Sequence, residues 1–258
     1  MSDQATLQAT ADAEIRQARP GIARWVAQPL VCVVGIAAAF TYINVKTISK
    51  KEVALLNNQT LVDSSLKHLY LTAVAAVLVV LIAIPLGVLL TRGVMRRYSG
   101  AVMAVSGFGQ AAPAVGLVVL AALIFGIGDV PFIGALTVYG ILPVLANVVA
   151  GLDSVDPKLV EAGRGMGMSA FATLRAVELP IAVPIMLTGV RTALVLMCGT
   201  AAFGGLVGAG GLGAYLNSGI KLGEKPMLII GAVMIAMLAL LLDWLARVVE
   251  VVCTPKGL

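Results

Sequence analysis

Charged residues are scarce in this sequence. Only 12% of the 258 residues are Asp, Glu, Lys or Arg, whereas 60% are hydrophobic, and the mean hydropathy is +1.01. A water-soluble domain carries about a quarter of its residues as charged side chains. A chain with half that share has too few charged side chains for a fully water-exposed surface, so the composition excludes a soluble domain and indicates an integral membrane protein.

Aromatic residues, histidine and cysteine are also few. Aromatics make up 5% of the chain, and the basic residues lie between apolar runs, which excludes a basic, aromatic-rich nucleic-acid surface. His68, the single histidine, stands at the edge of an apolar run and is expected to be an interfacial polar residue. Cys32, Cys198 and Cys253 form no C-x-x-C pair, so no disulfide framework or zinc site follows. A membrane-embedded enzyme would need converging His, Asp or Cys side chains, and the single His and the dispersed Cys argue against one. We expect no metal or cofactor in this chain.

Six apolar runs are long enough, or nearly so, to cross a bilayer core of roughly 30 Å, which takes about 20 helical residues. Lipid cannot satisfy open backbone groups, so each run must be a helix. The expected fold is therefore an all-α integral membrane protein with six transmembrane helices. The runs are Gln28–Ile43, Leu69–Leu90, Ala101–Ile127, Phe132–Leu152, Ile181–Val207 and Met227–Ala246.

Lys and Arg are divided unequally between the two sides of these runs. One side carries 11 of them and the other 6, and both termini lie on the richer side. The positive-inside rule therefore places both termini in the cytoplasm. The richer side holds Arg16, Arg19, Arg24, Arg92, Arg96, Arg97, Lys158, Arg164, Arg175, Arg247 and Lys256, and the other holds Lys46, Lys50, Lys51, Lys67, Lys221 and Lys225.

The chain is divided accordingly into four parts. Residues 1–27 form a cytoplasmic N-terminal segment, 28–66 the first span and an external loop, 67–246 the core with the other spans, and 247–258 a cytoplasmic tail. The external loop, Asn44–Lys67, has an intermittent apolar face that predicts a short helix lying on the membrane surface. An ordered connector is an equally good interpretation of this loop.

The segment from Asp153 to Pro180 leaves the membrane on the cytoplasmic side and has clear helix-capping residues. Asp156 is a good N-cap and Pro157 suits the first helical position. Ser169 can cap a second helix with an apolar stripe of Phe171, Leu174 and Val177, and Pro180 is expected to close it. Three glycines separate the two helices: Gly163, Gly165 and Gly167. The prediction is a helix, a glycine bend and a second helix.

Within this segment the residues resemble a known family. Glu161-Ala162-Gly163, then Gly167, then Val177-Glu178-Leu179-Pro180 match the E-A-A-x3-G-x9-I-x-L-P signature of ABC-transporter import permeases, with Gly163 for the second Ala and Val177 for Ile. The resemblance implies a coupling helix that sits in a groove of a cytoplasmic ATPase. Glu161 would contact the ATPase, Ala162 and Gly163 would permit close approach, and Gly167 would set the bend, with Leu179 and Pro180 completing the signature. The alternative is a well-capped cytoplasmic hairpin without a partner.

The resemblance extends over about Lys67 to Asp243. Gly189–Ile220 and Phe108–Gly128 are similar to permeases that import glycine betaine, carnitine, choline and related osmoprotectants. The family implies that this chain is a transport subunit and no enzyme, in the inner membrane of a prokaryote. Its implied partners are two ATPases that hold ATP and Mg, a second permease in a homodimer or heterodimer, and an external binding protein. Methionine importers share part of the pattern and remain an alternative. A secondary transporter independent of an ATPase would couple through intramembrane carboxylates, which here fall mostly in loops or at span ends.

Polar residues inside the spans indicate a translocation pathway, because lipid penalises them. The candidates are Gln110, Pro113, Asn147 and Thr200. Gln and Asn also form hydrogen bonds between helices, so a packing role remains open. Arg191 lies deep in the fifth run, where a charge must be paired or reach the interface. Asp243 is a candidate partner, and an ion pair is favoured over contact with a cationic substrate, which a positive charge would repel.

Residues 208–213 read GAGGLG and fit G-x-G-x-x-G. A dinucleotide-binding loop follows a strand and opens a helix in the cytosol, whereas this run follows a long apolar helix and emerges on the outer side. A nucleotide site is therefore excluded. Its glycines, Gly208, Gly210, Gly211 and Gly213, predict a tight, close-packed turn. This turn would belong to an external gate or a rim for the binding protein, or would simply end the span.

Overall fold

The computed structural model describes residues 22–45 and 57–254, and all regular structure among them is helical. The predicted all-α membrane fold is confirmed. The α-helices are α2 (Ile22–Val45), α4 (Asn58–Leu90), α5 (Ser99–Ala111), α6 (Ala114–Phe125), α7 (Asp129–Asp153), α8 (Pro157–Gly165), α9 (Ala170–Thr173), α10 (Leu179–Thr200), α11 (Gly213–Leu222) and α12 (Lys225–Cys253). Two 3-10 segments, η1 (Gly93–Tyr98) and η3 (Ala201–Leu206), and one π segment, η2 (Leu174–Glu178), connect them.

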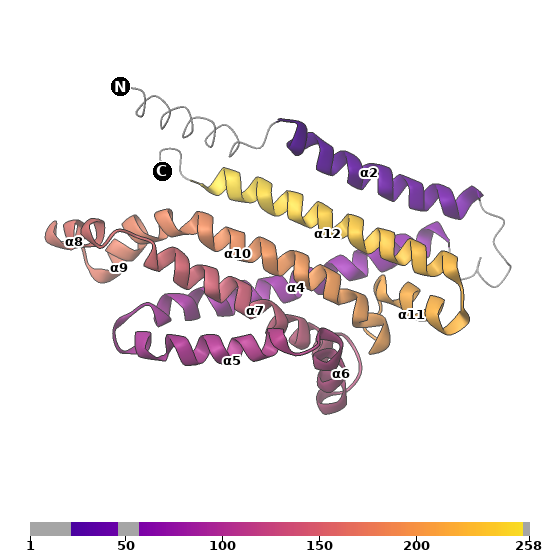
Figure 1. The fold of residues 1–258 in the computed structure, drawn as a ribbon, viewed down its shortest axis with the longest axis horizontal. Coiled ribbons are helices and arrows are strands. Elements are labelled where there is room, and N and C mark those ends of the chain that lie inside the picture. Colours follow the sequence, from indigo (N-terminus) through magenta and orange to yellow (C-terminus); the bar gives the residue numbers. More distant parts are fainter. Residues whose placement is uncertain (1–21, 46–56, 255–258) are drawn as a thin grey trace, which may run out of the picture.

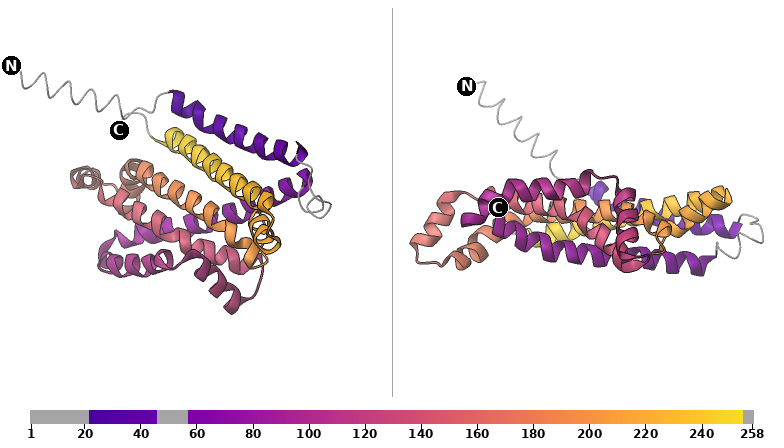
Figure 2. Two further views of the ribbon diagram at one scale, coloured as in Figure 1. Left: turned by 45° about the vertical axis from the view of Figure 1, so that its right-hand side comes forward. Right: turned by 90° about the horizontal axis from the view of Figure 1, so that it is seen from below.

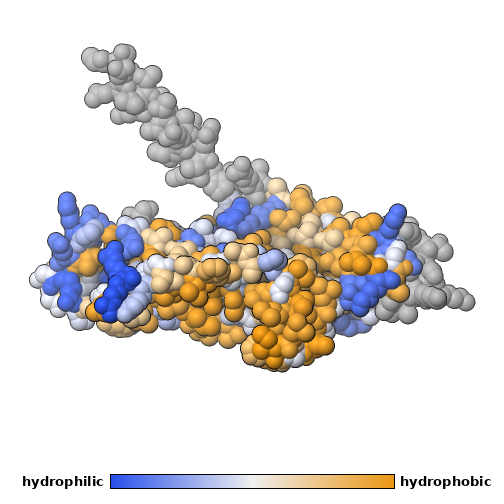
Figure 3. Space-filling view, turned by 60° about the horizontal axis from the view of Figure 1, so that its bottom comes forward, coloured by the Kyte–Doolittle hydropathy of each residue, from blue (hydrophilic) through white to orange (hydrophobic). Residues whose placement is uncertain are grey.

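The long helices lie side by side in an elongated bundle (Figure 1). Among the described residues, five helices are long and apolar enough to cross a membrane, or six spans if the bent pair of α5 and α6 is counted as one. An apolar band covers the middle of the molecule, and hydrophilic residues gather at its two ends (Figure 3). This distribution is expected of a bundle whose middle faces lipid and whose ends face water.

Helix α7 lies at the centre of the bundle and packs against both α4 and α10. Small residues bring these backbones together: a Cβ added to Gly189 of α10 would lie 2.7 Å from the Pro143 carbonyl oxygen of α7. A Cβ added to Gly87 of α4 would lie 2.4 Å from Val148 Cγ1 of α7. Close van der Waals contact through small residues is how helices associate in lipid.

Helix α2 lies along α12 at one edge of the bundle (Figure 1). Gly35 of α2 faces Met237 of α12, and Trp244 Nε1 donates a hydrogen bond to the Trp25 carbonyl oxygen at 3.1 Å. The first predicted run is therefore a helix of membrane-spanning length, although it begins at Ile22, before the predicted start at Gln28.

The prediction of one continuous helix over Ala101–Ile127 is wrong. The chain breaks between α5 and α6, whose axes are bent by 94°, and α6 turns away from the bundle (Figures 1 and 2). Pro113 is the physical reason: it disfavours helical geometry at the preceding residue, and Ala112 has the extended angles φ −62° and ψ 141°.

Helix α4 begins at Asn58, well before the predicted start at Leu69. Asn57 caps it, because its side chain accepts a hydrogen bond from the Thr60 amide at 2.8 Å in a capping box, and Leu61 is fully buried. The surface-lying helix predicted for the external loop is therefore wrong for residues 57–67, which are the first turns of α4. The rest of that prediction, over residues 46–56, lies outside the described residues.

Pro180 does not close the second helix of the cytoplasmic segment, contrary to prediction. The chain runs through α9, η2 and α10 as one helical stretch, and Ala170–Leu206 is a single candidate span. The Leu179 amide donates to the Leu174 carbonyl, five residues back. Proline in a regular helix removes one hydrogen bond and clashes with the carbonyl four residues earlier. The wider π turn changes the hydrogen-bond register immediately before Pro180, so the helix continues.

Candidate functional site

The α7–α10 segment, residues 154–178, projects beyond one end of the bundle (right panel of Figure 2). Both predicted caps are present. Asp156 Oδ1 accepts a hydrogen bond from the Lys158 amide at 2.9 Å, and Ser169 Oγ accepts one from the Ala172 amide at 3.2 Å. Each cap satisfies an amide that the first helical turn leaves unpaired, so both short helices have defined starting points outside the bundle.

The predicted bend lies at Gly167, which has φ +86° and an open surrounding. A side chain is disfavoured there by the backbone conformation alone. Gly163 of α8 is buried on the side that faces α9, and a Cβ there would lie 3.3 Å from Met168 Sδ and 3.4 Å from Thr173 Cγ2. Its small size therefore serves packing inside the segment. The role that the family resemblance implies for it, close approach by a partner, stays a prediction. Glu161 and Ala162 are exposed.

Three large apolar side chains of this segment lie on its surface. Leu159 is 48% exposed, Met166 78% and Phe171 70%. The sequence placed Phe171 in one packed stripe with Leu174 and Val177. Only Leu174 packs against the main core, and the helix changes from α to π at that residue, so a spacing of three did not identify a common face. Exposed apolar side chains at a polar end of a protein mark an interaction surface.

A pocket of about 320 Å³ lies where the α7–α10 segment meets the ends of α4 and α7. Glu161 lines it, and so do two ion pairs that the sequence analysis did not identify. Arg96 pairs with Asp153 at 3.3 Å, and Arg92 donates to both carboxylate oxygens of Glu178, at 3.1 and 2.5 Å. The first pair is exposed, whereas the Glu178 side chain is only 6% exposed.

The candidate pathway residues are not brought together by any hydrogen bond within the described residues. Asn147 Nδ2 donates to the Pro143 carbonyl of its own helix at 2.8 Å, and its Cβ meets Gly189 where α7 crosses α10. Gln110 lies near the end of α5, Pro113 is exposed at the start of α6, and Thr200 is the buried last residue of α10. Asn147 therefore contributes to helix packing, and the pathway role of the four remains a prediction.

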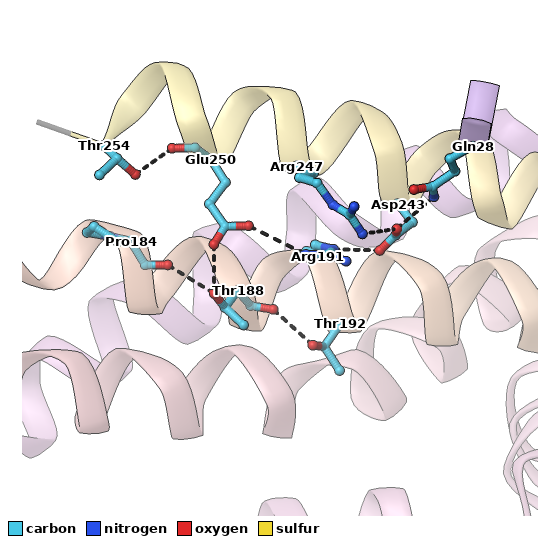
Figure 4. Close-up of polar contacts among 9 residues, drawn as sticks. All are labelled: Gln28, Pro184, Thr188, Arg191, Thr192, Asp243, Arg247, Glu250 and Thr254. Atoms are coloured by element: carbon cyan, nitrogen blue, oxygen red, sulfur yellow. Dashed lines mark hydrogen bonds and ion pairs between the residues drawn. The ribbon is translucent and has the colours of Figure 1, made fainter. Parts of the chain in front are cut away.

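The predicted pairing of Arg191 with Asp243 is present and belongs to a larger polar network (Figure 4). Arg191 Nε lies 2.5 Å from Asp243 Oδ1, and Arg247 approaches the other carboxylate oxygen at 3.2 Å. Glu250 lies 3.7 Å from Arg191, and Gln28 of α2 donates to Asp243 at 2.8 Å. Two arginines and two carboxylates have no net charge, which explains how these groups are tolerated within spans.

The glycine run forms the predicted close-packed turn at the opposite end of the bundle. Gly208, Gly210 and Gly211 have φ of +72°, +76° and +66°. A Cβ on Gly213 would lie 2.1 Å from the Ala202 carbonyl oxygen, so only glycine fits that contact. The gate and rim roles of this turn remain predictions.

His68 lies beneath this turn and is fully buried, so its predicted interfacial position is wrong. Its Nε2 lies 3.0 Å from the Cys198 carbonyl oxygen, and a Cβ on Gly211 would lie 3.3 Å from the His68 Cα. The cause is the outward extension of α4, which places His68 in the interior of the helix bundle.

The chain matches the family described as binding-protein-dependent transport system inner membrane component over residues 83–251. It therefore belongs to this family and is a membrane-spanning permease, which confirms the resemblance found in the α7–α10 segment.

Individual relatives define the subgroup. The chain is 38% identical to the glycine betaine/carnitine/choline transport system permease protein OpuCB of Bacillus subtilis, over 74% of this chain and 88% of that protein. It is 40% identical to the osmoprotectant import permease protein OsmW of Salmonella typhimurium, over 77% and 94% respectively. In structure it is similar to a chain of the MetNI methionine ABC transporter in an inward-facing conformation, with a TM-score of 0.69 and 26% identity over 81% of this chain and 100% of that one.

Proposed function

We propose that this chain is the permease subunit of an ATP-driven importer for quaternary-amine osmoprotectants such as glycine betaine, carnitine and choline. The identities of 38–40% to osmoprotectant permeases, against 26% to the methionine transporter chain, support this substrate class. In this proposal the chain itself holds no nucleotide and no metal. ATP and Mg are bound by two cytoplasmic ATPase subunits, and an external binding protein delivers the solute to a pair of permeases in the inner membrane.

The observation that carries the ATPase contact is the surface of the α7–α10 segment. It presents the exposed carboxylate of Glu161, which has no ion-pair partner among the described residues, and also exposed Met166 and Phe171, at one end of the bundle. A projection that combines exposed apolar side chains with an exposed carboxylate fits a groove on a partner protein. The same end carries the start of α2 and the end of α12 (Figure 1), so the proposal places both termini in the cytoplasm with the ATPases.

The test is co-purification of the tagged permease with its ATPase subunits, together with uptake of labelled solutes by the assembled system. Glu161→Lys and Phe171→Glu should each reduce the co-purified ATPase by about tenfold, because both place an unfavourable charge in the contact. Asp63→Lys is the matched control: it reverses an exposed carboxylate on α4 at the opposite end and should leave co-purification unchanged.

The substrate class is decided by separate uptake assays with glycine betaine, carnitine, choline and methionine. Uptake of the three quaternary amines, dependent on ATP and on the binding protein, is the expected result. Uptake of methionine alone would replace the substrate assignment and leave the ATPase contact standing. Uptake that persists without ATP would identify a secondary transporter and overturn the proposal.

A further inference from the structure

The inner end of α4 is joined to the α7–α10 segment through one carboxylate. Glu178 is the last residue of η2, its side chain is 6% exposed, and both of its oxygens accept hydrogen bonds from the Arg92 guanidinium. Bidentate arginine–carboxylate pairs fix orientation as well as distance. Arg92 lies two residues beyond the end of α4, so the pair links two helical stretches at a defined angle.

The other end of α4 lies against the glycine turn. His68 packs under Gly211, and the Tyr215 hydroxyl of α11 donates to Thr60 Oγ1 at 3.0 Å. The helix between these contacts has 33 residues, which is about 50 Å at 1.5 Å per residue. One continuous element therefore contacts the α7–α10 segment at one end of the molecule and the glycine turn at the other.

Glu161 and Glu178 line the same pocket but have different surroundings. Glu161 is exposed on α8 and forms no ion pair with any described residue, whereas both carboxylate oxygens of the buried Glu178 are held by Arg92. A partner protein can reach the first carboxylate but not the second. The two acidic residues of the signature region must therefore act differently.

We propose that the Arg92–Glu178 pair transmits displacement of the α7–α10 segment to α4, and through α4 to the glycine turn. Glu178 is thus a positioning residue that converts ATPase binding into movement of the spans. This inference rests on the proposed function, because it needs an ATPase to displace the segment. It assigns no ATPase contact to Glu178 itself.

The first test separates ATPase binding from coupling in the assembled transporter. Glu178→Gln should retain co-purified ATPase and ATP hydrolysis within about twofold, while uptake of labelled glycine betaine per ATP hydrolysed falls by about tenfold or more, because Arg92 loses its paired charge. Glu161→Lys should instead lose the ATPase. Asp153→Asn, which removes the exposed pair with Arg96, is the matched control and should change uptake by less than about twofold.

A second test restores the connection by other means, which a variant that merely misfolds would not permit. Arg92→Glu combined with Glu178→Arg should regain part of the uptake that each single variant loses. Cysteines at positions 92 and 178, in a Cys253→Ser background, should give low uptake that rises when a bifunctional thiol reagent links them. Cys32 and Cys198 are buried and stay unmodified.

The outcomes distinguish the two proposals. If the unmodified permease binds no ATPase, the proposed function fails and this inference fails with it. If it binds the ATPase and transports, but Glu178→Gln couples normally, only this inference is overturned. It is also overturned if Glu178→Gln loses the ATPase as Glu161→Lys does, or if the cross-link stops transport, because the pair would then have to open during the cycle.

Discussion

Gly199 and Gly213 lie near one another in the sequence but in opposite surroundings. A Cβ on Gly213 would lie 2.1 Å from the Ala202 carbonyl oxygen and 2.9 Å from the Gly205 amide nitrogen, both of them backbone atoms. Gly199 is helical and exposed, with nothing within 4 Å of an added Cβ. Contact with neighbouring backbone atoms therefore requires glycine at position 213, whereas position 199 has room for a side chain.

We therefore expect Gly213→Ala to lower the thermal unfolding temperature of the purified permease, because η3 or α11 must shift at a cost of about 1–3 kcal/mol. Gly199→Ala should be neutral or stabilising by up to about 1 kcal/mol, since alanine is the better helix former. Unfolding curves of both variants in the same detergent measure the difference. Equal unfolding temperatures would show that the turn is loosely packed.

At the level of helices, the polar network joins α2, α10 and α12 within the apolar part of the molecule. Arg191 and Asp243 are 27% and 18% exposed, and each also contacts a third charged residue. Removing one member leaves the others uncompensated where water is scarce, which costs more than the intact pair contributes. The network therefore holds α12, and α2 packed on it, against α10.

Arg191→Met should destabilise the permease by about 1–3 kcal/mol, less than a fully buried pair because the groups are partly exposed. Arg97→Met is the matched control, since Arg97 is exposed and stacks over Tyr98 at 4.7 Å; it should cost less than about 0.5 kcal/mol. Thermal unfolding of both variants makes the comparison. The double variant Arg191→Asp with Asp243→Arg should recover part of the loss. Equal stability of Arg191→Met and Arg97→Met would contradict a structural role for the network.

At the level of the whole molecule, hydrophilic residues gather at two opposite ends (Figure 3), and the proposed function places the end with the α7–α10 segment in the cytoplasm. The end of α12 and the α7–α10 segment lie at the same end of the molecule, and α11 lies at the opposite end (Figure 1). Cys253 is exposed at the first end, whereas Cys32 and Cys198 are buried. The native cysteines therefore report orientation without any substitution.

A membrane-impermeant maleimide should label Cys253 in inside-out vesicles and not in intact spheroplasts, because the positive-inside rule places that end in the cytoplasm. Lys221→Cys in a Cys253→Ser background is the complementary reporter and should be labelled in spheroplasts only. Labelling in the reverse pattern would invert the topology and remove the α7–α10 segment from reach of a cytoplasmic ATPase.

Much of this architecture could be predicted because lipid limits the alternatives. Long apolar runs must be helices, a deep Arg191 needs a partner such as Asp243, and Asp156 and Ser169 cap helices through local contacts alone. The break at Pro113, the π turn before Pro180 and the early start of α4 were missed. Hydropathy marks apolar runs, and it does not report where Pro113 breaks a helix, where the hydrogen-bond register changes before Pro180, or where the Asn57 cap starts a helix within polar sequence.

The sequence by itself determined the membrane location, the helical class, the capped α7–α10 segment and the family, because these follow from hydrophobicity and from short-range spacing. Only the tertiary structure decided which polar residues meet. It buried His68 beneath the glycine turn, enclosed Gly163 between α8 and α9, and paired Glu178 with Arg92. The contacts of His68 and Glu178 join residues far apart in the chain, and the close packing of helices, which no local pattern encodes, selects them.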